Sequence, residues 1–139
     1  YWNDDIEIVE SFVLKTIKRF DQNNGIEQEL LPMFKDETDR EFAFKLLRES
    51  LFNGKEYRAL IDKYTKNWET ERIALMDMVI MQIAIAELLT FPSIPVSVTL
   101  NEYIDEAKSY STAKSASFIN GILDSMVKDL KEEKRIIKK

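Results

Sequence analysis

The side chains that most often perform chemistry in proteins are missing from this chain of 139 residues. It contains no cysteine and no histidine, which removes thiol and serine-histidine nucleophiles, histidine proton transfer and the usual zinc and haem ligands. It has only three glycines, and its sequence contains neither a calcium-binding loop spacing nor a glycine-rich phosphate loop. We therefore expect a protein that is not an enzyme, with no catalytic residues, no metal site and no cofactor.

Two carboxylates stand on an otherwise apolar segment, residues 73–89. Besides Asp77 and Glu87, only Gln82 is polar there. Methionine, leucine, alanine, glutamine and glutamate favour a helix, and the two acids argue against a membrane span. The segment therefore predicts a buried central helix. Acids in such a helix need partners, and pairing with Arg72 or with a helix terminus is the default explanation.

Apolar residues at helical spacing predict further helices around this central one. Short loops and turn signals separate them, and no repeat or second domain is visible. The sequence thus predicts an all-α fold, a compact bundle of five to six helices in a single domain over residues 1–139. The expected helices cover about residues 4–20, 38–52, 55–66, 73–89, a stretch that starts between 95 and 99 and ends near 110, and a last helix capped at 111–112 or 115.

Several local features carry more specific expectations. Thr38 and Thr99 each precede a glutamate by three residues, which predicts two capping boxes. Trp68 is expected to anchor the core at a corner. Gly121 lies inside an apolar stripe and predicts a close contact between helices. The charged tail, residues 128–139, is interpreted as a fraying helix end rather than a binding arm.

The charge balance limits the possible partners. The formal net charge is −5 and the isoelectric point is about 4.9, which disfavours binding of a polyanion over the whole surface but leaves room for a local basic face. No signal peptide or lipidation motif is visible, so we expect a cytoplasmic protein without a membrane partner. The first residue is Tyr1 rather than methionine, which indicates a processed chain or a fragment.

A series of motifs in the second half resembles the NusB family. The resemblance covers roughly Asp39 to Val127, and residues 118–123 are its most specific part. It implies an all-helical fold of two packed bundles and a role in transcription antitermination of ribosomal RNA operons, in which the protein and a small-subunit ribosomal protein, NusE, together hold the single-stranded boxA element of the nascent RNA. The matching motifs are Asn67-Trp68, Arg72-Ile73, Asp77, Ile80, Ala84, Glu87-Leu88, Ile94-Pro95-Val96, Asn101-Glu102, residues 107–110 and residues 117–124.

The resemblance directs attention to four residues around the start of the last helix. Single-stranded RNA is usually held by aromatic stacking and cationic contacts. Tyr110, Lys114 and Phe118 would lie near one another if the loop folds the last helix back, and Lys108 is one helical step away. Phe118 could equally be buried core, and the two lysines could simply face solvent. The family also implies that an acid matching Asp77 helps to engage the NusE partner.

Other positions depart from the family pattern. The family begins with an arginine-rich helix that carries much of the RNA affinity, and the first helix here is not arginine-rich. Met78 and Gln82 stand where arginine is frequent, and Lys114 stands where an acid is common. We therefore expect weak RNA binding by this chain alone, and a chain that is the C-terminal part of a longer NusB-like protein with a basic segment upstream.

Two other functions fit the same sequence. The first is a helical protein-protein interaction domain, without catalysis, that has lost RNA recognition and docks a partner through apolar and acidic residues. The second is a NusB-like accessory domain of a ribosomal RNA cytosine methyltransferase, which requires a downstream enzyme domain. An upstream arginine-rich helix would favour antitermination, and a downstream methyltransferase would favour the accessory domain.

Overall fold

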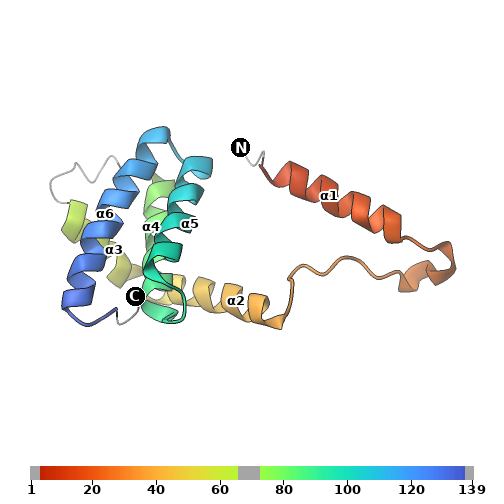
Figure 1. Ribbon diagram of the computed structural model, residues 1–139, viewed down its shortest axis with the longest axis horizontal. Helices are drawn as coiled ribbons and strands as arrows, with labels where there is room; N and C mark the ends of the chain where they lie inside the picture. The colour runs from red at the N-terminus through yellow and green to blue at the C-terminus, as the bar shows by residue number, and fades with distance from the viewer. Residues whose placement is uncertain (1–3, 66–72, 137–139) are drawn as a thin grey trace. The chain divides into compact units, whose positions relative to one another are not determined.

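A computed structural model of the chain describes residues 4–65 and 73–136, without the side chains of residues 4, 5 and 113. The expectations for Asn67, Trp68 and Arg72 lie outside these residues. All regular structure within the described part is helical (Figure 1), which confirms the all-α prediction. The chain divides into two compact units, Tyr1–Arg40 and Glu41–Lys139. The helices are α1 (Asp4–Arg19), the 3-10 helix η1 (Gln22–Glu27), α2 (Glu37–Phe52), α3 (Gly54–Thr65), α4 (Leu75–Thr90), α5 (Val96–Tyr110) and α6 (Ala113–Glu132).

The first unit consists of α1, η1 and the first turn of α2. α1 spans the predicted segment and has Lys18 and Arg19 in its last turn, where cations favour the negative end of the helix dipole. Asp21 starts η1, because its Oδ1 accepts a hydrogen bond of 2.9 Å from the N–H of Asn23. The apolar stripe of α1 is solvent-exposed, and its members include Ile6, Val9, Val13 and Ile17.

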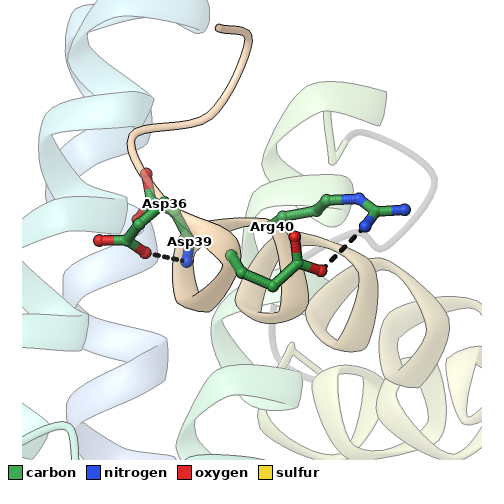
Figure 2. Close-up of polar contacts among 4 residues, drawn as sticks. Asp36, Asp39 and Arg40 are labelled. Atoms are coloured by element: carbon green, nitrogen blue, oxygen red, sulfur yellow. Dashed lines mark hydrogen bonds and ion pairs between the residues drawn. The ribbon is translucent and has the colours of Figure 1, made fainter.

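The start of α2 differs from the predicted capping box. The helix begins at Glu37, and Asp36 Oδ1 accepts a hydrogen bond of 2.9 Å from the N–H of Asp39 (Figure 2). Arg40 Nη1 lies 2.8 Å from Glu37 Oε1. Thr38 is therefore inside the first turn and does not cap it. Asp36 can take the capping position because its carboxylate is a strong acceptor for an N–H group at a helix N-terminus.

α4 forms the buried centre of the second unit, as its sequence predicts. It packs against α3, α5 and α6, and α6 also packs against α3 and α5 (Figure 1). Because α4 is apolar on nearly every side, it can be covered from several directions. Complete burial of each of its large side chains contributes about 1.5–3 kcal/mol. The buried residues of α4 are Asp77, Ile80, Met81, Ala84, Ile85, Ala86, Glu87 and Leu88.

α5 follows α4 after a proline-containing turn. It starts at Val96, with Pro95 at the N-cap position, which agrees with the earlier of the two predicted starts. Thr99 is consequently inside the helix and caps nothing, so the second predicted capping box is wrong. Its side chain is fully buried, and its Oγ1 has no hydrogen-bond partner among the residues that the structure describes.

The close approach predicted at Gly121 occurs at a different glycine. Among the described residues, and apart from the neighbouring residues and backbone of its own helix, nothing lies within 4 Å of the place where a Cβ of Gly121 would be. A Cβ on Gly54, by contrast, would lie 2.9 Å from Gln82 Nε2. Gln82 donates a hydrogen bond of 2.8 Å to the carbonyl oxygen of Ser50 and accepts one of 3.3 Å from Arg58 Nε. The missing side chain of Gly54 thus gives Gln82 access to the end of α2.

The end of α6 is docked rather than frayed. Beyond Glu132, Lys134 adopts a left-handed backbone with φ of 57°. The N–H groups of Arg135 and Ile136 return to the carbonyl oxygen of Leu130 at 2.9 and 3.1 Å, and Ile136 is buried. This is the pattern of a Schellman cap with its apolar contact. The fraying predicted for the tail is therefore wrong up to residue 136, where the description ends.

Candidate nucleic-acid interface

The junction between α5 and α6 is short. Tyr110 is the last residue of α5, Ser111 is the C-cap, and Thr112 is the N-cap of α6. Ser111 has an extended backbone, with φ of −130° and ψ of −151°, and its N–H donates to the carbonyl oxygen of Ala107 at 3.0 Å. The chain thus turns from one helix into the next within two residues, which places the end of α5 beside the start of α6.

Hydroxyl groups organise this junction. Thr112 Oγ1 accepts a hydrogen bond of 3.3 Å from the N–H of Ser115, and Ser115 Oγ accepts one of 3.3 Å from the N–H of Thr112. This reciprocal capping box starts α6 at one of the caps that the sequence predicts. Ser111 Oγ lies 3.0 Å from Ser115 Oγ and donates to Asp77 Oδ1. The junction is therefore linked to the first turn of α4.

Asp77 is buried at 6% exposure. Its described partner is Ser111, and it also stands in the first turn of α4, where an acid favours the positive end of the helix dipole. The alternative partner Arg72 lies outside the described residues. The carboxylate offers little surface of its own for a direct contact with another protein.

Glu87 lies nearer the other end of α4 and is equally buried. Its Oε2 accepts a hydrogen bond of 2.8 Å from the hydroxyl of Tyr103 on α5. Burial, followed by the hydrogen bond and the negative charge of Glu87, raises the pKa of Tyr103 well above its usual value. The pair joins the middle of α5 to the last turn of α4, at the opposite end of α4 from Asp77.

Lys114 is exposed in the first turn of α6, a helix of 20 residues with no acid in that turn. A cation at this end opposes the helix dipole, at a cost of about 0.3–1 kcal/mol. The same position favours a bound anion, because the free N–H groups of the first turn and the ammonium group attract negative charge together. The position of Lys114 therefore lowers the stability of the helix but favours the binding of a phosphate group.

Lys108 is placed differently. It lies on α5 two residues before Tyr110, and residues at that spacing do not share a helix face. Its Nζ lies 2.6 Å from Asp105 Oδ1, with both side chains more than half exposed. Such exposed pairs contribute about 0–1 kcal/mol. The two-residue spacing therefore places Lys108 and Tyr110 on different faces of α5.

The two aromatic residues have intermediate environments. Tyr110 is 37% exposed, and Phe118 is partly buried against the hydrophobic core. Phe118 follows Lys114 by four residues, so their side chains share one face of α6. The two interpretations of Phe118 are thus combined in one side chain, with part of it in the core and part at the surface.

The described residues hold no group of three or more carboxylates that could bind a metal ion. Within the same part of the chain, no helix is both long enough and apolar enough to cross a membrane.

The sequence predicts a cap of the last helix at residues 111–112 or 115, and Ser115 is part of the capping box that starts α6. The link of Ser111 to Asp77 is not visible in the sequence, because it joins residues 34 positions apart.

The described residues form an all-helical domain with a hydroxyl-rich junction between α5 and α6. The family model described as NusB family matches residues 7–128, and the chain belongs to this family. The match confirms the resemblance seen in the second half and extends it to α1.

Similar proteins support the same assignment. A transcription antitermination protein NusB from Salinibacter ruber is 36% identical over 132 residues, covering 91% of this chain and 82% of the relative. The one from Acetivibrio thermocellus is 39% identical over 106 residues, 76% of this chain and 70% of the relative. For the one from Chloroherpeton thalassium the identity is 40% over 94 residues, 68% of this chain but only 44% of the relative.

A solved structure of T. maritima NusB is similar in fold, with a TM-score of 0.64 and 32% identity over 84% of this chain and 82% of that one. Together these matches assign the chain to transcription antitermination.

Proposed function

We propose that this chain acts in the cytoplasm as an antitermination factor that binds boxA-type single-stranded RNA together with a NusE-type ribosomal protein, without catalysis. Its membership of the NusB family supports this role. The exposed position of Lys114 in the first turn of α6, four residues after Tyr110 in the sequence and on the same helix face as Phe118, carries the proposal.

The RNA contacts follow from this arrangement. Lys114 and the N-terminal N–H groups of α6 would bind a phosphate, and the exposed part of Phe118 or Tyr110 would stack on a base. Lys108 would contribute a longer-range attraction, because its exposed pair with Asp105 is weak and can be exchanged for a phosphate.

The partner would dock at the start of α4, around Asp77. Leu75, Met76 and Val79 are 76%, 41% and 38% exposed there, and apolar side chains of this kind favour a protein partner. Since Asp77 itself is buried, its neighbours would make most of the contact. The transcription complex would then receive the RNA and both proteins as one unit.

One observation favours the alternative of a protein-binding domain without RNA. Four apolar side chains on α2 are exposed by more than half, and the net charge of the chain is negative. Both features suit contacts with proteins better than contacts with RNA. The residues on α2 are Phe44, Leu47, Leu51 and Phe52.

A fluorescence-anisotropy titration separates the two functions. Labelled boxA-like single-stranded RNA is titrated with the chain, with and without the NusE-type protein, at about 50 and about 200 mM salt. We expect binding about tenfold or more tighter with the partner, and weaker at the higher salt. RNA of scrambled sequence is the control. The absence of RNA binding in both conditions, with the partner still bound, would favour the domain without RNA recognition.

A further inference from the structure

Side chains from α4 and from both sides of the α5–α6 junction form one connected hydrogen-bond network. It runs from Asp77, 6% exposed, through Ser111 to Ser115, 5% exposed, and on to the exposed Thr112. Thr112 Oγ1 and Ser115 Oγ lie 2.8 Å apart, and Ser115 Oγ and Ser111 Oγ lie 3.0 Å apart. The network therefore connects a buried carboxylate to the surface of the junction.

The carboxylate of Asp77 determines which way the hydroxyl proton of Ser111 points. An ionised acid can only accept, so the single hydroxyl proton of Ser111 is directed to Asp77. Ser111 Oγ also contacts Ser115 Oγ, and between Ser115 Oγ and Thr112 Oγ1 either atom can be the donor. The carboxylate of Asp77 thus determines the donor role of Ser111, the residue that joins α4 to the junction.

This network adjoins the proposed RNA contacts. Tyr110 directly precedes Ser111, and Lys114 directly precedes Ser115. The backbone of Ser111 is extended rather than helical, so the path of the chain from α5 into α6 depends on what holds its side chain. A change at Ser111 would therefore move both proposed contact residues relative to each other.

We propose that Asp77 is a positioning residue for RNA binding: through Ser111 it holds the α5–α6 junction in the conformation that presents Tyr110 and Lys114. This inference rests on the RNA-binding function proposed above. It gives Asp77 a role that does not require contact with the partner protein, in agreement with its burial.

Three variants and a matched control test the proposal. Asp77→Asn removes the charge, Ser111→Ala removes the donor, and Ser111→Thr keeps a hydroxyl and should restore binding. Glu87→Gln is the control, because Glu87 has the same 6% exposure on the same helix and also pairs with a hydroxyl of α5, but away from the junction.

The Kd for boxA-like RNA in the presence of the NusE-type protein, the Kd for that protein alone and the Tm are measured for every variant. We expect Asp77→Asn and Ser111→Ala to weaken RNA binding about tenfold, as for loss of a hydrogen bond to a charged group. Ser111→Thr should stay within about twofold of the unchanged chain, as should Glu87→Gln even where its Tm falls. Amide hydrogen exchange at residues 111–115 should accelerate in the first two variants only.

Three results would overturn the inference. If RNA affinity falls equally in Asp77→Asn and Glu87→Gln, the loss in Asp77→Asn results from general destabilisation of the fold. Weakened binding of the NusE-type protein by Asp77→Asn, with normal amide exchange at the junction, would make Asp77 a direct partner contact. RNA binding that is absent already in the unchanged chain would remove the proposed function, and this inference with it. If Asp77→Asn fails to fold, Ser111→Ala and its threonine counterpart decide the matter.

Discussion

The two buried acids of α4, Asp77 and Glu87, have equal exposure and each accepts a hydrogen bond from a hydroxyl, but one hydroxyl lies within α5 and the other directly after its end. Tyr103, which pairs with Glu87, lies within the helix, with further helix on both sides of it. Ser111, which pairs with Asp77, is the residue at which the chain leaves α5 for α6. The first pair therefore holds two helices together, while the second also determines how an exposed junction is arranged.

Burial of an acid therefore does not by itself indicate a function. What matters is the segment to which the partner belongs. A hydroxyl in the middle of a packed helix transmits a change only to the core, whereas a hydroxyl at a helix end transmits it to the surface residues beside it.

The largest effect on stability is expected at the Glu87 end. Tyr103→Phe leaves a buried carboxylate without this donor and should lower the free energy of unfolding by about 1–3 kcal/mol. RNA affinity, measured on the folded variant, should not change. Urea unfolding measures the stability and the anisotropy titration measures the RNA affinity. A parallel loss of RNA affinity would show that the Glu87 pair affects RNA binding as the Asp77 pair does.

The pH dependence provides a second measurement on the same variant. Because burial and Glu87 raise the pKa of Tyr103 above its usual value of 10.0, the folded state keeps this proton when the unfolded state loses it. The contribution of Tyr103 to the free energy of unfolding is fully present below pH 10. Above pH 10 the free energy of unfolding decreases by up to about 1.4 kcal/mol per pH unit. Tyr103→Phe should therefore show a shallower loss of stability above pH 10 than the unchanged chain.

Phe118→Leu tests whether the exposed part of Phe118, on α6 near the junction, contributes to RNA binding. Leucine keeps much of the apolar contact with the core but cannot stack on a base, so RNA binding should weaken about tenfold. Ile119→Val is the matched control on the adjacent, fully buried residue, and it should cost about 0.5–1.5 kcal/mol of stability without an RNA defect. If Phe118→Leu changes only the Tm, Phe118 belongs to the core alone.

The smallest effect is expected for Lys114→Gln. Loss of one phosphate contact should reduce the slope of log Kd against log salt by about 0.7. Stability should rise by about 0.3 kcal/mol, because a cation is removed from the positive end of α6. Lys128→Gln, an exposed lysine late in the same helix, should change neither quantity. If the slope of log Kd against log salt is unchanged in Lys114→Gln, Lys114 does not contact a phosphate of the RNA.

Much of the fold could be predicted because helix periodicity and composition are local properties. α1 and α4 are close to their expected bounds, and the cap at Thr112 is one of those expected. The predictions failed where two local signals compete. Asp36 took the cap expected at Thr38, and the prolines before α5 started that helix ahead of Thr99.

The candidate site could be predicted only in part. The residue types at Tyr110, Lys114 and Phe118 indicated stacking and phosphate contacts, and their spacing placed the last two on one face. The separation of Lys108 from Tyr110 follows from helix geometry, whereas the link from Asp77 to Ser111 depends on how α4 and α5 pack. That register is set by the whole core and has no local signature.

The contact between Gly54 and Gln82 has a consequence for sequence divergence. A side chain at position 54 would displace the Gln82 amide and break its hydrogen bond to Ser50. The two positions are therefore expected to change together: a residue larger than glycine at 54 should accompany a shorter one at 82 in divergent sequences. Independent variation of the two would show that α2 and α4 can be joined in another way.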